Sequence, residues 1–449
     1  TGNRGFCREL PGKQERKELM VTAIIVGAGH RAVGYANYAL DFPEKLKIVG
    51  VADPSPERRA MTAKKFGLAP EQCYSSAEEL AALPKQADAI INGTMDRQHV
   101  PTTIPLLERG YDVLLEKPFA VSIEEVEALS AAVRKTGRKV MICHVLRYAP
   151  FYYELKRRVL AGEIGRLITL ETAEHVSYHH YSTAFARGKW HREDECGSSF
   201  LMSKCCHDLD LLTWYMSGVS PVRVASFGGL HYFTRENAPA NSGEHCLLDC
   251  PIEKECPYSV RQLYLNHPDR WVFYVWPELE ESGDLSIEAK TARLRDPSNP
   301  YSRCIWKMDN NVADRQSVVV EFADGTVATH NLVGGASRPM RKIHLLGTTG
   351  ELEGVFDDNE FTLRHIDTRP GCETHEERFN LADLGDTTGA FGGHGGGDGR
   401  LVADFVSLLD GGSPSISCTM LSDSINGHKI GFYADRAMRE HRVIEFREP

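Results

Sequence analysis

The 449-residue sequence lacks several features that would direct attention to other classes of protein. It has no excess of positive charge, since 62 acidic residues outnumber 52 basic ones and the formal net charge is -10. Nucleic-acid binding needs a basic face, so we expect no nucleic-acid partner. No apolar run approaches the length that crosses a bilayer, so we expect no membrane association. No stretch near residue 1 has the order of a secretion signal, and we expect a cytoplasmic protein.

The sequence also shows no internal repeat, and 449 residues are too many for one ordinary hydrophobic core. Hydrophobic residues make up 42% and charged residues 25%, which is typical of globular proteins. Residues 1–20 show no apolar period, and we interpret them as a disordered arm or a cloning remnant. The remainder divides into two expected domains, residues 21–146 and residues 147–449.

A glycine-rich turn follows the first apolar strand, residues 21–26, and opens a helical stretch. Its pattern is G-x-G-x-x-A. Gly27 permits the tight turn, Gly29 lets a pyrophosphate approach the backbone, and the alanine keeps the helix close to the sheet. A second strand, residues 47–52, ends at Asp53, whose carboxylate suits the ribose hydroxyls and repels a 2′-phosphate. We therefore predict NAD as the cofactor, with NADP disfavoured. The predicted contacts here are Gly27, Gly29, His30, Arg31, Ala32 and Asp53.

Strands and helices continue to alternate as far as residue 143. Strands are expected over 87–92, 112–115 and 139–143, with helices over 101–109 and 121–135. This alternation predicts an α/β Rossmann domain with a doubly wound parallel sheet. Hairpin-like strands over 318–332 and 343–366 then predict a second sheet, and a last helix is expected over 422–440.

One motif identifies a family resemblance. Glu116-Lys117-Pro118 directly follows a strand, with Thr94 and His99 upstream. Together with the glycine turn, these residues resemble the Gfo/Idh/MocA oxidoreductases, named after glucose-fructose oxidoreductase and inositol dehydrogenase. The resemblance implies a second α/β domain with a large open, mostly antiparallel sheet, and a homo-oligomer, either dimer or tetramer. It also adds Thr94, His99, Glu116 and Lys117 to the expected cofactor contacts.

The resemblance further implies catalytic residues. Lys117 would lie near the nicotinamide, and the family's D-x-x-x-H motif corresponds here to Ser203 through His207, with Ser203 in place of the aspartate. Lys204 stands three residues before His207, so both can share one face at the start of a helix expected over 211–216. Histidine titrates near neutral pH and suits a general base. We predict His207 as the base, Lys117 as the residue that orients the substrate hydroxyl, and Lys204 as a second candidate.

The expected substrate is carbohydrate-like. Aromatic and hydrogen-bonding groups follow the strand 167–172, and sugars stack on rings while their hydroxyls need polar partners. The candidate substrate contacts are Arg147, Tyr148, His180, Trp190 and Asp208. A glycine run over 392–397, with His394 and Asp398 nearby, is either a lid or a connector.

Cysteines cluster in a proline-rich insertion over about 232–301. Cys246, Cys250 and Cys256 have the spacing C-x3-C-x5-C, and Cys304 or His245 is available as a fourth ligand. The spacing is compatible with a structural zinc and equally with reduced, unliganded thiols.

Three functions remain open on the residues alone. The first is NAD-dependent hydride transfer to or from a sugar, polyol or glycoside. The second is glycoside cleavage with tightly bound NAD, through transient oxidation, elimination, water addition and re-reduction. The third is a non-catalytic dinucleotide-sensing regulator on the same fold.

Overall fold

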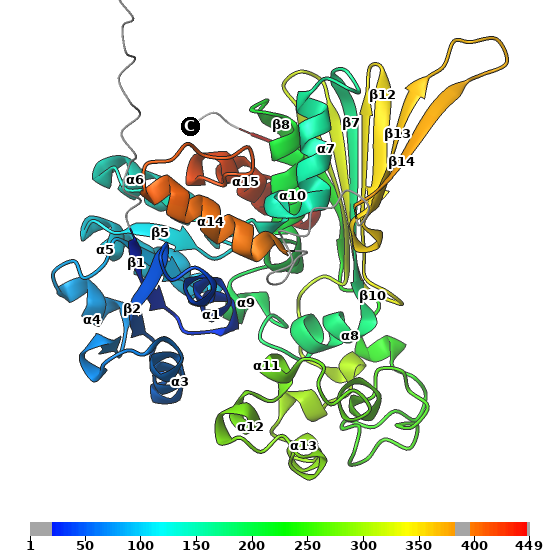
Figure 1. The fold of residues 1–449 in the computed structure, drawn as a ribbon. Coiled ribbons are helices and arrows are strands. Elements are labelled where there is room, and N and C mark those ends of the chain that lie inside the picture. Colours follow the sequence, from blue (N-terminus) through cyan, green and yellow to red (C-terminus); the bar gives the residue numbers. More distant parts are fainter. Residues whose placement is uncertain (1–19, 382–395, 447–449) are drawn as a thin grey trace, which may run out of the picture.

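The computed structural model describes residues 20–381 and 396–446. The predicted arm up to residue 19 and His394 lie outside the described residues. Two sheets lie side by side, and a helical lobe projects from one end of the second sheet (Figure 1). Among the described residues, no helix is both long and apolar enough to cross a membrane.

The first sheet is parallel and has six strands in the order β3-β2-β1-β4-β5-β6. Its central strands are buried on both faces, which explains their continuous apolar sequences. The predicted Rossmann fold is confirmed. The strands are β1 (Val21–Val26), β2 (Leu46–Ala52), β3 (Cys73–Tyr74), β4 (Ala89–Asn92), β5 (Asp112–Leu115) and β6 (Val140–Ile142).

Helices cover both faces of this sheet. They are α1 (His30–Ala36), α2 (Tyr38–Asp41), α3 (Pro56–Phe66), α4 (Ala77–Ala82), α5 (His99–Glu108), α6 (Ile123–Thr136) and α14 (Gly397–Leu409). The last of these comes from far along the chain. Leu401 and Phe405 of α14 pack into the same core as Ala32 and Ile25, so the sequence-based division at residue 146 separates segments that share one core. Figure 1 shows α14 lying across the first domain.

The second sheet has nine strands in the order β14-β13-β12-β11-β7-β10-β9-β8-β15. Among the described strands only the pair β7–β10 is parallel, so the predicted mostly antiparallel sheet is confirmed. The strands are β7 (Leu167–Ser177), β8 (Pro221–Gly229), β9 (Arg315–Phe322), β10 (Val327–Ala336), β11 (Met340–Gly347), β12 (Gly350–Val355), β13 (Glu360–Ile366), β14 (Thr374–Asn380) and β15 (Ile444–Glu445). Helices α7 (Pro150–Leu160), α10 (Phe200–Tyr215) and α15 (Leu421–Glu440) accompany this sheet (Figure 1).

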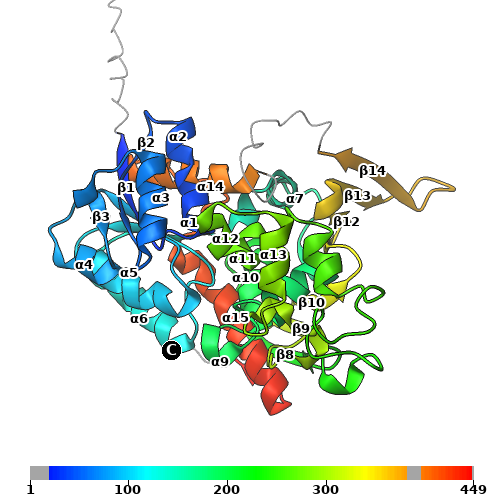
Figure 2. The same ribbon diagram turned by 90° about the horizontal axis from the view of Figure 1, so that it is seen from below.

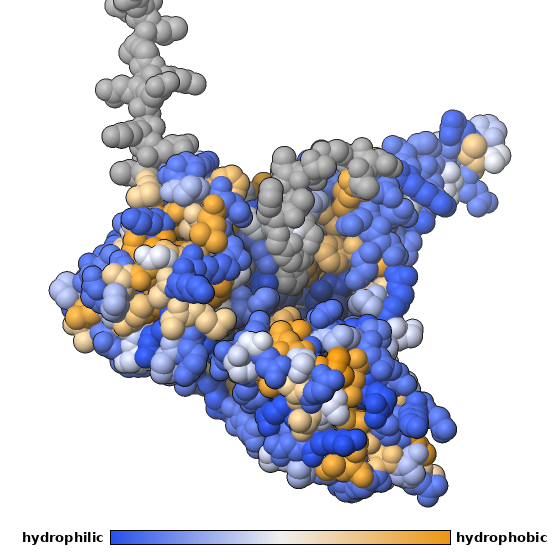
Figure 3. Space-filling model, turned by 60° about the horizontal axis from the view of Figure 1, so that its bottom comes forward, coloured by the Kyte–Doolittle hydropathy of each residue, from blue (hydrophilic) through white to orange (hydrophobic). Residues whose placement is uncertain are grey.

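Residues 230–314 leave the sheet between β8 and β9 and form what we call the insertion lobe. The lobe is longer than the predicted 232–301. It contains α11 (Val272–Val275), α12 (Pro277–Ser282) and α13 (Ile287–Leu294), packed on a small core of their own around Trp276 and Tyr264. Seen from below, these helices lie beside α1 of the first domain (Figure 2). The surface is hollowed between the first domain and the lobe (Figure 3).

Candidate functional site

The glycine turn between β1 and α1 leaves space for a ligand. Gly27 has a φ of +77°, and a Cβ on it would lie 2.7 Å from the Thr94 nitrogen, so the fold itself requires glycine there. Gly29 differs, because a Cβ on it would meet nothing closer than the Gly93 oxygen at 3.9 Å. Packing therefore does not explain Gly29, whereas the close approach of a pyrophosphate does. The turn fits a dinucleotide.

Asp53 lies at the end of β2, as predicted, and the backbone holds its carboxylate. Its two oxygens accept hydrogen bonds from the Ala28 nitrogen at 2.7 Å and the Ser55 nitrogen at 2.8 Å. Each oxygen keeps a further lone pair for a ribose hydroxyl. Arg59 donates to the Asp53 carbonyl, while Arg58 is exposed.

A partly buried ion cluster joins the glycine turn to the Glu116-Lys117 motif. The Arg31 guanidinium contacts Glu116 at 3.1 Å and pairs with both oxygens of Asp398 at 2.9 Å. Tyr35 and the Lys117 nitrogen also donate to Glu116, at 2.7 and 2.6 Å. Burial alone would raise the pKa of Glu116, but the charges of Arg31 and Lys117 hold that pKa below its ordinary value. Glu116 and Arg31 thus form the frame of the cofactor turn.

His99 connects two loops at the same edge of the sheet. Its ring nitrogens lie 2.7 Å from the Pro118 oxygen and 3.0 Å from the Thr94 oxygen. The buried imidazole therefore fixes the loop that carries Lys117 relative to the loop after β4. Both nitrogens are engaged by backbone, which favours a positioning role for His99.

The structure brings Lys117 to the helix that carries the other predicted catalytic residues. The Lys117 ammonium donates to the Ser203 carbonyl at 3.0 Å, one residue before Lys204. Helix α10 begins at Phe200, so the predicted helix start near residue 211 is wrong, and Lys204 and His207 lie within the helix. Every residue of α10 except Lys204 is buried, which removes the apolar period that would have revealed the helix.

Lys204 and His207 have different partners. Lys204 forms an ion pair with the buried Glu174 of β7 at 3.1 Å. The His207 ring meets the His144 ring edge to face, with centroids 5.5 Å apart. A lysine whose ammonium is paired with a carboxylate suits electrostatic stabilisation of an alkoxide better than proton abstraction.

His180 belongs to the same site. Burial lowers the pKa of His180 well below its ordinary value, and the nearby charges of Lys204 and Lys117 contribute to that lowering. Its ring packs on that of Trp271 in the insertion lobe, with the ring centroids 4.5 Å apart. Trp271 has a φ of +61°, which costs a non-glycine residue about 1–2 kcal/mol. Strained residues that packing holds in place often line functional sites.

Three other predicted substrate contacts are engaged elsewhere. Arg147 is buried and donates both 2.6 Å bonds of a bidentate pair to Asp210, so it is not available to a substrate. Tyr148 donates to Asp404 at 2.7 Å. The carboxylate of Asp208 lies 3.1 Å from Arg341.

Trp190 is placed at the domain junction, where its indole donates to Asp96 at 3.1 Å. Its ring also lies 5.8 Å from that of Tyr274 in α11.

The insertion lobe reaches the cofactor turn. Phe273 of α11 stacks on His30, with ring centroids 4.4 Å apart and ring planes at 6°. The lobe therefore lies beside the turn that would hold the pyrophosphate, as Figure 2 shows for α11 and α1. No local sequence pattern predicts this contact, because two residues so distant in the chain meet only through the tertiary fold.

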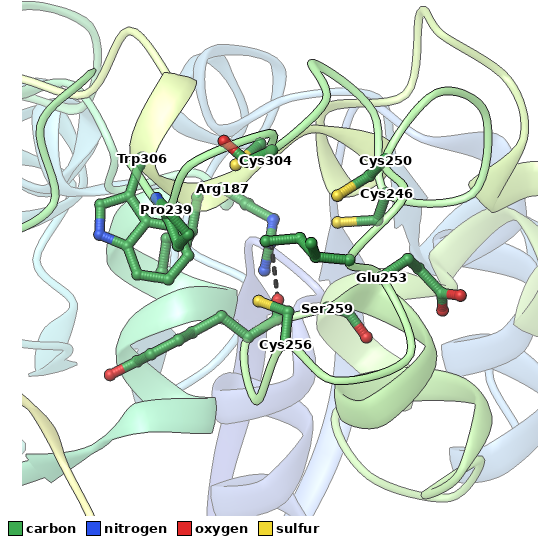
Figure 4. A pocket seen from close by; sticks show the side chains of 13 residues that line it. Arg187, Pro239, Cys246, Cys250, Glu253, Cys256, Ser259, Cys304 and Trp306 are labelled. Atoms are coloured by element: carbon green, nitrogen blue, oxygen red, sulfur yellow. Dashed lines mark hydrogen bonds between the residues drawn. The ribbon is translucent and has the colours of Figure 1, made fainter. Parts of the chain in front are cut away.

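The four cysteines of the predicted zinc site line one small cavity in the insertion lobe (Figure 4). Within the described residues, however, only Cys205, Asp208 and His330 bring three metal-binding atoms within 4.8 Å of one another. The Arg341 cation beside Asp208 disfavours a metal at that second cluster. His245, the other predicted fourth ligand, contacts Ser302 at 2.8 Å through Nδ1.

Sequence reasoning missed several residues of the site. Tyr35, His144, His428, Trp271 and Phe273 were not predicted. Burial lowers the pKa of His144 and of His428 well below the ordinary value. The His428 ring lies 3.8 Å from that of Phe119, next to the Glu116-Lys117-Pro118 motif. Of these residues, only Trp271 and Phe273 could have been singled out from the sequence, because they lie in the aromatic stretch 271–276.

Comparison with known proteins gives a consistent result. The Gfo/Idh/MocA model of an oxidoreductase family with an NAD-binding Rossmann fold matches residues 21–144, and the model of its C-terminal alpha/beta domain matches residues 156–446. The putative oxidoreductase YteT of Bacillus subtilis is 26% identical over 81% of this chain and 82% of its own. The scyllo-inositol 2-dehydrogenase (NAD(+)) of the same organism is 31% identical, but the match covers 34% of this chain and 43% of that relative. A levoglucosan dehydrogenase solved with NADH superimposes with a TM-score of 0.67 at 16% identity, over 96% of this chain and all of the other.

Proposed function

Because the chain belongs to the Gfo/Idh/MocA oxidoreductase family, we propose that it transfers a hydride between NAD(H) and a hydroxyl-bearing carbon of a sugar or polyol. Membership makes the protein an NAD(P)-dependent oxidoreductase, so the regulator hypothesis is set aside. The carbohydrate class is our inference. It is supported by the names of two similar proteins, the inositol dehydrogenase and the levoglucosan dehydrogenase, and by the aromatic and imidazole groups at the site.

One observation carries the proposal. The Lys117 ammonium, which follows the cofactor-side motif, lies against α10 at the Ser203 carbonyl. This contact places the end of β5 beside the helix of Lys204 and His207. A substrate carbon near the nicotinamide would then have a cation and an imidazole within reach, which is what oxidation of an alcohol needs.

In the oxidative direction, the C–H hydride leaves the carbinol carbon and the hydroxyl proton goes to His207. The products are a carbonyl compound and an imidazolium, and bound NAD supplies the hydride acceptor. Lys117 donates a hydrogen bond to the substrate oxygen, and Lys204 adds positive charge where the alkoxide develops. In the reductive direction, His207 returns the proton.

Cofactor preference follows from Asp53. We propose that the protein prefers NAD to NADP, because a carboxylate held at the end of β2 repels a 2′-phosphate.

The test is replacement of the base. We expect His207→Ala to lower kcat by at least about 100-fold, because a general base usually contributes that much to the rate. The dissociation constant for NADH should change by no more than about three-fold. His375→Ala, at an exposed position of β14, is the matched control and should leave both quantities unchanged. Activity that survives in His207→Ala would refute the assignment and direct attention to His180.

One observation favours the second candidate, redox-neutral cleavage of a glycoside on retained NAD. The stack of Phe273 on His30 lies beside the pyrophosphate turn and would slow exchange of the cofactor. Incubation with a panel of sugars and aryl glycosides separates the two functions. A dehydrogenase forms NADH in proportion to the sugar consumed, whereas the second reaction releases the aglycone with no net NADH.

We also propose a homo-oligomer assembled through the second sheet. Apolar side chains on five of its strands are exposed, which is unusual for a sheet face without a partner. They are Ile168, Phe227, Val319, Val327 and Ile366, with exposed fractions from 38% to 75%. Sedimentation at micromolar concentration should show a dimer or tetramer, and a monomer would contradict the proposal.

A further inference from the structure

We propose that the insertion lobe holds one structural zinc ion, bound by Cys246, Cys250, Cys256 and Cys304. The four thiols come from two separate segments of the lobe and line a single cavity of about 10 Å³ (Figure 4). A space of that size holds one water-sized sphere, which suits a single ion and not an iron–sulfur cluster. Four thiolates are the ligands of many structural zinc sites.

The backbone brings the two segments together before any metal is considered. The Cys246 nitrogen donates to the Ser302 oxygen at 3.0 Å, and the Cys304 nitrogen donates to the Glu244 oxygen at 2.8 Å. His245 and Arg303 thus pair as an antiparallel bridge, with one cysteine directly after each. The two segments enclose most of the lobe, including α11, so an ion between them would close the lobe near its base.

A buried positive charge at the same cavity is the second observation. Arg187 is 1% exposed and lines the cavity, and its Nη1 atom has no hydrogen-bond partner. Its other donors reach the backbone oxygens of Arg303 at 2.8 Å and Tyr258 at 3.0 Å. No carboxylate of the described residues forms an ion pair with it.

A buried guanidinium without a carboxylate is costly, and the proposed site explains it. Four thiolates around Zn²⁺ carry a net charge of about −2, so the centre would supply the missing counter-charge.

The thiols must close in when the ion binds. Ligands of a tetrahedral site with Zn–S bonds of about 2.3 Å lie roughly 3.8 Å apart, whereas no three of these sulfur atoms lie within 4.8 Å of one another. The lobe near these residues consists of turns and short helices, which can adjust by such an amount.

The experiment measures zinc in the full-length protein, purified with reducing agent, exposed to zinc sulfate and then desalted. We expect one zinc per chain in the native protein and in the control Cys73→Ala, whose thiol lies on β3. We expect less than about a tenth of that in Cys250→Ala/Cys256→Ala, since two ligands cannot hold the ion. Arg187→Met should retain zinc but release it to a competing chelator at about ten-fold lower chelator concentration, because neighbours of a metal centre affect affinity by that order.

A second measurement does not depend on the variants folding. A mercurial thiol reagent added to the native zinc-loaded protein should release one zinc as the four ligand thiols react, and a colorimetric zinc indicator follows the release. Zinc-free native protein, or equal zinc in the double variant, would overturn the proposal. A thiol count below twelve in unfolded, unreduced protein would do the same, since it would indicate a disulfide. None of these readouts uses catalysis, so the proposed function stands or falls separately.

Discussion

The protein should lose stability between pH 7.5 and pH 6.0 because of three histidines, of which two are buried and His180 is half-buried. His144, His180 and His428 lie near the junction of the two domains, and burial lowers the pKa of each well below its ordinary value. In the folded state they stay neutral at pH 6, whereas in the unfolded chain each takes up a proton with a pKa near 6.5. Protonation of the unfolded chain therefore lowers the free energy of unfolding as the pH falls through about 6.5.

The magnitude follows from linkage. A group that is neutral in the folded state and has an unfolded pKa of 6.5 contributes about 0.8 kcal/mol between pH 7.5 and pH 6.0. Asp435 acts in the opposite direction, because burial raises its pKa to about 6 and the folded state binds its proton first. Its contribution over the same interval is about 0.4 kcal/mol. The net loss expected from the four groups is about 2 kcal/mol.

The assay is urea unfolding at the two pH values, followed by fluorescence. His428→Gln can still accept the hydrogen bond that His428 Nε2 receives from the Phe119 nitrogen, and it should reduce the loss by about 0.8 kcal/mol. His375→Gln, at an exposed position, should not change the loss. Equal unfolding free energies at pH 7.5 and pH 6.0 in the native protein would refute the reasoning.

Three further predictions concern the cofactor. Phe273→Ala should raise the rate of NADH dissociation about 2- to 12-fold, the effect expected from loss of one aromatic stack. The control Ile287→Ala, on the same lobe, should leave that rate unchanged. Equal stopped-flow rates in Phe273→Ala and the native protein would contradict the role of the contact. Gly29→Ala should weaken NADH binding in a fluorescence titration and leave the melting temperature unchanged. Gly27→Ala should lower the melting temperature, because Gly27 has a positive φ and a Cβ there would collide with Thr94. The reverse pattern would exclude our interpretation of the turn. Asp53→Ala should weaken NAD and reduce the preference over NADP by at least about ten-fold, and an unchanged ratio of kcat/KM values would reassign the specificity.

The cofactor half of the protein was predictable because its signals are local. The strand, the glycine turn, the helix and Asp53 follow one another within about thirty residues, and each obeys a rule of backbone geometry. The second sheet was predictable in type, since hairpins and alternating strands such as β9 and β10 show a period of two. Its strand order was not, because β7 pairs with two strands more than 150 residues away.

The parts that escaped prediction depend on contacts between distant segments. Arg31 and Asp398 form their ion pair across 367 residues, and no sequence period marks that pairing. Helix α10 was placed too late in the chain because it is buried on nearly all sides and lacks an amphipathic pattern. A family motif led to Lys117, whose ammonium reaches helix α10, whereas residue type alone led to Arg147, whose guanidinium is paired with Asp210.

The insertion lobe contacts the candidate site at several points. The segment that carries His180 is held by the lobe at both ends. Near its start, His180 packs on Trp271, and at its end Arg187 binds the backbone of Tyr258 and Arg303. The position of the His180 imidazole therefore depends on the lobe, although β7, which precedes the segment, belongs to the second sheet. A lobe fixed at its base can hold Trp271 in its unfavourable conformation, because the strain is then offset by contacts elsewhere in the lobe. Substrate selectivity should accordingly follow the lobe, while the hydride-transfer chemistry follows Lys117 and α10.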